Sequence, residues 1–160
     1  MDHQRPSPDG SIRKRVFIQA SPSTIFRALT DARALVHWFC DRASSYPQVG
    51  GELTACWRSG KSRTKGRAVF RRLEPESDVE LLWVDEGSGP VATNARHQLS
   101  YKIIQKRTAC EVVLTDEDAS LPDEETLAIL DEGWNSVLKE LKDYCEREER
   151  SRRSLNRRSE

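Results

Sequence analysis

The sequence lacks any long apolar segment. No run within its 160 residues approaches the ~20 apolar residues that span a membrane. The N-terminal residues also lack the apolar core of a secretory signal peptide. We therefore expect a cytoplasmic protein without a membrane span.

Cysteine and histidine are scarce, with four and three residues respectively. No two cysteines form a Cys-x-x-Cys pair, and no two histidines have the spacing of metal ligands. The sequence therefore predicts neither a metal site nor another cofactor. We expect mostly buried, reduced thiols at Cys40, Cys56, Cys110 and Cys145.

An excess of either charge is missing as well, since Lys plus Arg and Asp plus Glu both number 26. This balance gives no overall attraction to nucleic acid or to a membrane surface. The stretch Ser59-Gly60-Lys61-Ser62 lacks the spacing of a phosphate-binding loop. An arginine-rich end could contact phosphates, but its interleaved glutamates favour a solvated tail; its arginines are Arg147, Arg150, Arg152, Arg153, Arg157 and Arg158.

What the sequence does have is one long amphipathic segment, residues 122–147. Its apolar residues recur every three or four positions, which predicts a helix with one apolar side. They are Leu127, Leu130, Trp134, Val137, Leu138, Leu141, Tyr144 and Cys145. At 1.5 Å per residue such a helix is roughly 39 Å long and needs a large apolar surface to pack on.

Strand patterns earlier in the chain supply that surface. Residues 12–20 form a first expected strand, and Ser21-Pro22 and Thr30-Asp31 each begin a short helix. Residues 41–51 are rich in Ser, Pro and Gly and are predicted to be a loop. Five period-two segments then follow, joined mostly by short turns, which predicts an antiparallel meander. The fold class is therefore α+β, with six strands.

The order of elements and several motifs resemble one known family. Ala20-Ser21-Pro22 followed by residues 25–31 is similar to its first helix, and His37-Trp38-Phe39 to the end of its second. Gly133-Trp134-Asn135 is similar to its C-terminal helix. These motifs resemble the START-like (SRPBCC) superfamily, in the AHSA1-like branch named for the activator of heat-shock protein 90 ATPase.

The resemblance implies a helix-grip fold, in which a curved antiparallel sheet of six strands wraps around the long C-terminal helix. It places one START-like domain over residues 11–148, between a disordered leader at 1–10 and a basic disordered tail at 149–160. Superfamily members bind hydrophobic small molecules between the sheet and the helix, and some are enzymes.

We accordingly predict a hydrophobic cavity for a small apolar or amphipathic ligand. Inward-facing residues are the expected binding set: Trp57, Phe70, Trp83, His97, Leu99, Tyr101, Trp134 and Leu138. The same residues could instead fill a solid core. The family name also implies a heat-shock ATPase as a partner and a role in the stress response. Exposed sheet edges leave a homodimer open.

An enzyme of cyclase or hydratase type is a third alternative. Histidine has an unperturbed pKa near neutrality, and His97 shares a predicted strand face with Tyr101, so the two could polarise a carbonyl together. That role requires both side chains in one cavity. Asp85 and Glu86 follow Trp83 and are more typical of a solvated turn than of an acid–base pair.

Overall fold

A computed structural model describes residues 11–86, 97–118 and 124–158. The leader at 1–10, the helix start at 122–123, the loop at 87–90 and residues 159–160 of the predicted tail lie outside these ranges. The strands are β1 Ser11–Ile18, β2 Arg42–Ser45, β3 Glu52–Ser59, β4 Ser62–Glu74, β5 Asp78–Glu86, β6 His97–Gln105 and β7 Cys110–Asp118. The helices are α1 Pro22–Thr30, α2 Ala32–Leu35 and α3 Glu124–Arg158.

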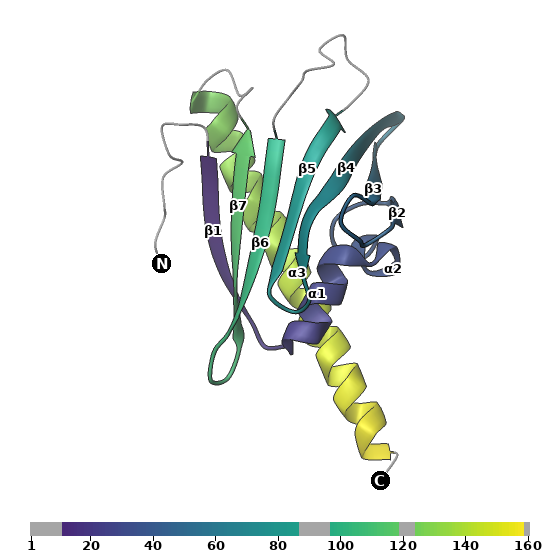
Figure 1. Ribbon diagram of the computed structural model, residues 1–160, viewed down its shortest axis with the longest axis vertical. Coiled ribbons are helices and arrows are strands. Elements are labelled where there is room, and N and C mark those ends of the chain that lie inside the picture. Colours follow the sequence, from purple (N-terminus) through teal and green to yellow (C-terminus); the bar gives the residue numbers. More distant parts are fainter. Residues whose placement is uncertain (1–10, 87–96, 119–123, 159–160) are drawn as a thin grey trace.

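The strands form one antiparallel sheet in the order β1-β7-β6-β5-β4-β3-β2. Helix α3 runs diagonally across one face of this sheet, and α1 and α2 lie beside it near the β3–β2 edge (Figure 1). This is the expected α+β helix-grip arrangement. The period-two patterns correctly predicted the inner face of β3 to β7, where alternate residues such as Leu53, Ala55 and Leu99, Tyr101 are buried.

The sheet has seven strands rather than the predicted six, because β2 lies within the stretch expected to be a loop. Arg42–Ser45 pairs with Leu53–Cys56 of β3, and the Ser45 hydroxyl donates to the Thr30 carbonyl at 2.6 Å. Without an apolar alternation of its own, β2 depends on these tertiary contacts and leaves little signal in the sequence.

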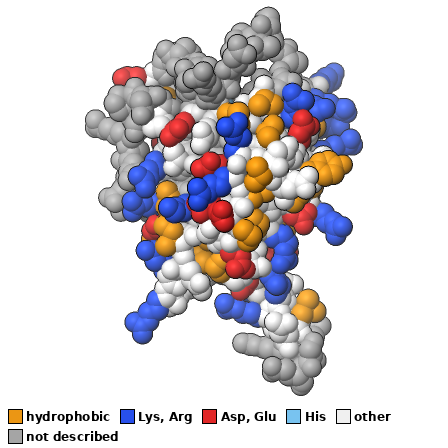
Figure 2. All heavy atoms as spheres, in the orientation of Figure 1, with side chains coloured by type: hydrophobic (Ala, Val, Ile, Leu, Met, Phe, Trp, Pro, Cys, Tyr) orange, Lys and Arg blue, Asp and Glu red, His pale blue; other side chains and the backbone are white. Residues whose placement is uncertain are grey.

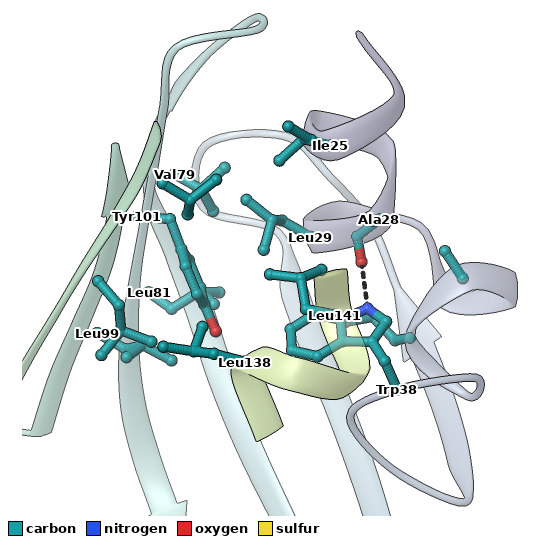
Figure 3. Packing of buried hydrophobic residues seen from close by; sticks show 14 of the residues in the cluster. Ile25, Ala28, Leu29, Trp38, Val79, Leu81, Leu99, Tyr101, Leu138 and Leu141 are labelled. Atoms are coloured by element: carbon teal, nitrogen blue, oxygen red, sulfur yellow. Dashed lines mark hydrogen bonds between the residues drawn. The ribbon is translucent and has the colours of Figure 1, made fainter. Parts of the chain in front are cut away.

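The predicted start of α1 is confirmed. Ser21 is the N-cap, with its hydroxyl accepting the Thr24 N–H at 3.2 Å, and Pro22 is the first helical residue. Asp31 caps α2 by accepting the Arg33 N–H at 2.9 Å. These two caps fix the turn that brings Trp38 under α1, where its indole N–H donates to the Ala28 carbonyl at 2.8 Å (Figure 3).

Helix α3 continues to Arg158, so the structure differs from the predicted helix end near Arg147 and from the predicted disorder beyond 148. Contacts with α1 hold the additional turns. The Thr24 hydroxyl donates to Glu149 at 2.8 Å, and Arg152 donates to the same hydroxyl at 2.9 Å. Beyond these contacts the helix projects past the sheet (Figure 1).

A second attachment joins the middle of α3 to the end of β1. Glu146 accepts the backbone N–H of Gln19 and the Lys142 ammonium, both at 2.9 Å, and Lys142 also donates to the Phe17 carbonyl at 2.7 Å. Burial opposes ionisation of Glu146, but the two hydrogen bonds lower its pKa below the ordinary value. The carboxylate is therefore charged at neutral pH, as this attachment requires.

The core lies between the sheet, α1 and the middle of α3 (Figure 3). Cys40, Cys110 and Cys145 are buried there and Cys56 is half-buried, all as free thiols. Burial raises the pKa of Cys40 to about 11 and that of Cys145 to about 12, so these thiols remain protonated. Among the residues that the structure describes, no helix has both the length and the apolar character needed to cross a membrane.

Candidate functional site

A cavity of about 390 Å³ lies between the sheet and the first turns of α3. Its sheet side is formed by Phe39, Trp57, Thr64, Lys65, Gly66, Trp83, His97 and Leu99. Its helix side is formed by Leu130, Gly133, Trp134 and Val137. Leu99 at the inner end is 1% exposed, whereas Leu130 is 39% exposed and Thr64 and Lys65 are exposed. The cavity therefore opens where the start of β4 approaches α3.

Three aromatic rings form a continuous wall. Phe39 packs edge-on against Trp57, with ring centroids 5.3 Å apart, and Trp83 lies 6.1 Å from both. The Trp57 indole N–H donates to the Phe39 carbonyl at 2.7 Å. This bond joins β3 to the segment after α2 and fixes the orientation of Trp57, so the wall is preformed.

Gly66 lets these rings pack against β4. A β-carbon at this position would lie 2.9 Å from Cζ3 of Trp83 and 3.2 Å from Cζ3 of Trp57. Any larger residue must displace one of the rings, and the space beyond them is the cavity.

We therefore expect Gly66→Ala to lower the free energy of unfolding by about 1–2 kcal/mol, because overpacking displaces the rings. Urea unfolding monitored by circular dichroism measures the change. Gly133→Ala is the matched control, because a β-carbon added there would have no heavy atom within 4 Å and alanine favours a helix by about 1 kcal/mol. Equal stabilisation by both substitutions would contradict the packing described for Gly66.

A buried carboxylate links the two sides of the cavity. Asp116 of β7 is 6% exposed, and its Oδ2 accepts the Trp134 indole N–H at 2.7 Å. Its Oδ1 is hydrogen-bonded to Nε2 of His97. Asp116 therefore holds one residue of each side, a histidine of β6 and a tryptophan of α3.

Sequence reasoning missed Asp116, although a signal was present. The alternation of β7 assigns Cys110, Val112 and Leu114 to the inner face, and continuing it by one step reaches position 116. The structure pairs this residue with Leu99 of β6. An acidic residue in an inward-facing register needs a buried partner, and that requirement could have singled it out.

The structure places five of the eight predicted binding residues on the cavity, namely Trp57, Trp83, His97, Leu99 and Trp134. The other three, Phe70, Tyr101 and Leu138, belong to the buried core instead. They are buried in one cluster with residues of α1 and α3, such as Leu29 and Leu141.

His97 and Tyr101 therefore lie in different surroundings. His97 lines the cavity, while Tyr101 is 3% exposed and packs among Leu99 and Leu138 (Figure 3). Burial, followed by the nearby Asp116 carboxylate, raises the pKa of Tyr101. Its hydroxyl thus stays protonated away from the cavity, and the geometry does not favour the joint catalytic role considered for this pair.

The remaining candidates lie elsewhere. His37 stacks on Tyr144 with centroids 5.3 Å apart, on the side of α3 that packs near α1. Asn135 is exposed. Within the described ranges, no three His, Cys, Asp or Glu side chains form a group suited to a metal ion.

Comparison with known protein families supports the fold described above. The family model for "Activator of Hsp90 ATPase homolog 1-like protein" matches residues 19–146. No curated protein matches this chain. Several solved structures share the fold at identities too low to carry function.

One is the Aha1 dimer from Colwellia psychrerythraea, with 22% identity, a TM-score of 0.68 and coverage of 85% of this chain and 96% of that one. A second is an AHSA1-like protein from Aeromonas hydrophila, with 15% identity, a TM-score of 0.69 and coverage of 84% and 90%. A third is DynU16, from the dynemicin biosynthetic locus, with 22% identity and a TM-score of 0.70; the match covers 86% of this chain and 47% of DynU16.

Proposed function

Because the chain belongs to the activator of Hsp90 ATPase homolog 1-like family, a branch of the START-like (SRPBCC) superfamily, we propose that it binds a small hydrophobic or amphipathic ligand between its sheet and α3. The observation that supports this proposal is the preformed, aromatic cavity of about 390 Å³. This volume is within the range of small-molecule sites, about 300–1,000 Å³. We further propose that the protein acts in the cytoplasm.

The apolar side chains that line the cavity indicate the main source of binding energy. Phe39, Trp57, Trp83, Leu99 and Val137 present apolar groups, so the main driving force is the removal of apolar ligand surface from water. Burying roughly 200 Å² of such surface contributes about 5 kcal/mol. Loss of translational and rotational freedom on association offsets part of this gain, so the net affinity is lower than the buried area alone indicates.

Polar groups are few and lie at defined places. Among the side chains on the cavity, Thr64, Lys65 and His97 are polar, and Trp134 directs its indole N–H to Asp116. A ligand with many polar atoms would leave several of them without partners, at a cost of about 1–3 kcal/mol each. The cavity therefore favours a largely apolar molecule.

The test is native mass spectrometry of the protein purified gently from its own host, compared with its denatured mass. We expect a reproducible extra mass in the native spectrum alone. Trp134→Ala should reduce the occupied fraction at least several-fold, because it removes an apolar wall of the cavity. Ile129→Ala, on the same helix at a side chain 66% exposed, is the control and should keep the extra mass.

An extra mass that persists in folded Trp134→Ala would contradict the proposed site. A clean mass for the native protein would favour a second candidate, a heat-shock ATPase as partner. That candidate is supported by the family description, which names an activator of the Hsp90 ATPase. Stimulation of such an ATPase by the purified protein would then be the decisive result.

A further inference from the structure

A second hollow lies beside the cavity, at the same β3–β4 hairpin. It has a volume of about 420 Å³ and is formed by residues of β2, β3 and β4 together with Asp41. We call it the basic hollow, because its charged side chains are Arg42, Arg58, Arg63, Lys65 and the single carboxylate of Asp41. Figure 2 shows Lys and Arg side chains gathered at the upper right, over the β3–β4 end of the sheet.

The four positive charges of the basic hollow face one carboxylate, that of Asp41. Arg58 and Arg63 are directly opposite each other on neighbouring strands, an arrangement that destabilises a sheet when both residues carry the same charge. The Oδ2 of Asp41 accepts the backbone N–H of Arg58 at 2.6 Å. Four cations against one carboxylate leave a formal charge of +3 on the side chains of the hollow. None of the four cations forms an ion pair with any residue that the structure describes.

The basic hollow adjoins the apolar cavity. Trp57, Thr64 and Lys65 contribute to the walls of both. Thr64 and Lys65 are exposed, and they lie at the end of the cavity that opens between β4 and α3. A molecule seated on the aromatic wall therefore has a cationic group within reach at the opening, and more cations just beyond it.

We infer that the ligand is an amphipathic anion, whose apolar body occupies the cavity and whose carboxylate, sulfate or phosphate group lies at the opening beside Lys65 and Arg63. This inference rests on the proposed function and adds the ligand's charge to it. The anion adds negative charge beside the Arg58–Arg63 pair, which shares the hollow with the carboxylate of Asp41 alone. It also explains why a mostly apolar cavity opens beside a cluster of cations rather than beside neutral residues.

The experiment compares two probes that differ only in charge, naphthoate and naphthamide. Both present the same flat apolar rings to the aromatic wall, and only naphthoate is an anion at neutral pH. Isothermal titration calorimetry at low ionic strength measures both affinities. We expect naphthoate to bind about three- to tenfold more tightly, the effect of one or two partly exposed ion pairs, and added salt to remove much of the difference.

The double variant Arg63→Gln/Lys65→Gln should abolish this preference, so that naphthoate and naphthamide bind it with equal affinity. The matched control is Arg13→Gln/Arg15→Gln, which removes the same charge from exposed residues of β1, at the other edge of the sheet. It should leave the preference intact.

Equal affinity for the two probes, or a preference that survives in Arg63→Gln/Lys65→Gln, would overturn the inference while leaving the apolar cavity supported. If neither probe binds, the proposed function fails and the inference fails with it. The two failures are therefore distinguished by naphthamide, whose binding needs only the apolar cavity.

Discussion

Replacing Asp116 with alanine is expected to lower the free energy of unfolding by about 3 kcal/mol. The substitution removes the acceptor of the Trp134 indole N–H and the partner of His97 at once. An indole N–H left buried without an acceptor costs about 1–3 kcal/mol, and the lost contact with His97 adds to this. Urea unfolding followed by tryptophan fluorescence and by circular dichroism measures the change.

Two variants make this result interpretable. Asp116→Asn keeps the size of the side chain and one oxygen acceptor, so we expect roughly half the loss. Glu117→Ala removes the neighbouring carboxylate, which is exposed on the outer face, and should change stability by less than about 0.5 kcal/mol. A loss below about 1 kcal/mol for Asp116→Ala would show that the carboxylate does not hold the cavity together.

Leu141→Ala is expected to cost about 3 kcal/mol, with 2–5 kcal/mol as the usual range for a buried leucine. Leu141 is 0% exposed and points from α3 into the space beside Leu29 and Trp38 (Figure 3). Its removal leaves a void between three elements, α1, α3 and the segment after α2, none of which can move in without losing its other contacts. The midpoint of urea unfolding should fall with an unchanged slope.

The control for Leu141→Ala is Ile129→Ala, about three turns earlier on the same helix, where the side chain is 66% exposed. We expect a change within about 0.5 kcal/mol. Similar losses at the two positions would contradict the packing role of Leu141, because alanine has the higher helix propensity and causes no loss by itself. Leu141→Ala should also leave the affinity for naphthamide nearly unchanged, because Leu141 does not line the cavity.

The sheet was largely predictable because one physical rule governs it. Side chains alternate between two faces, and only one face is covered by α3, so apolar residues recur at every second position. This rule identified β1 and the five strands from β3 to β7. It could not identify β2, whose Arg42–Ser45 segment carries no apolar alternation and is held by pairing with β3.

The C-terminal end of α3 could not be predicted from the sequence for a related reason. The apolar stripe ends at Cys145, and what holds the following turns is polar and distant in sequence. Thr24 contacts Glu149 and Arg152 from α1, more than a hundred residues earlier in the chain. The spacing of apolar residues within the helix cannot predict a polar contact with so distant a segment.

The candidate site was predictable in part. Period two places Phe70 and Trp83 on the same face, but it does not say which part of that face stays open. The difference arises from α1, which contributes Ile25 and Leu29 to the buried cluster containing Phe70 and contributes no residue to the cavity lining. The same alternation could have assigned Asp116 to the inner face of β7. It could not have predicted the hydrogen bonds of Asp116 to His97 and Trp134.

Helix α3 performs three tasks in succession along its length. The turns carrying Leu130, Trp134 and Val137 bound the cavity, those carrying Leu141 and Cys145 complete the core, and those carrying Glu149 and Arg152 attach to α1. Leu130 and Val137 line the cavity without belonging to the section that completes the core, whereas Trp134 also supports the fold through its bond to Asp116. If the cavity binds the proposed ligand, the helix side of its selectivity is set within about two turns of α3.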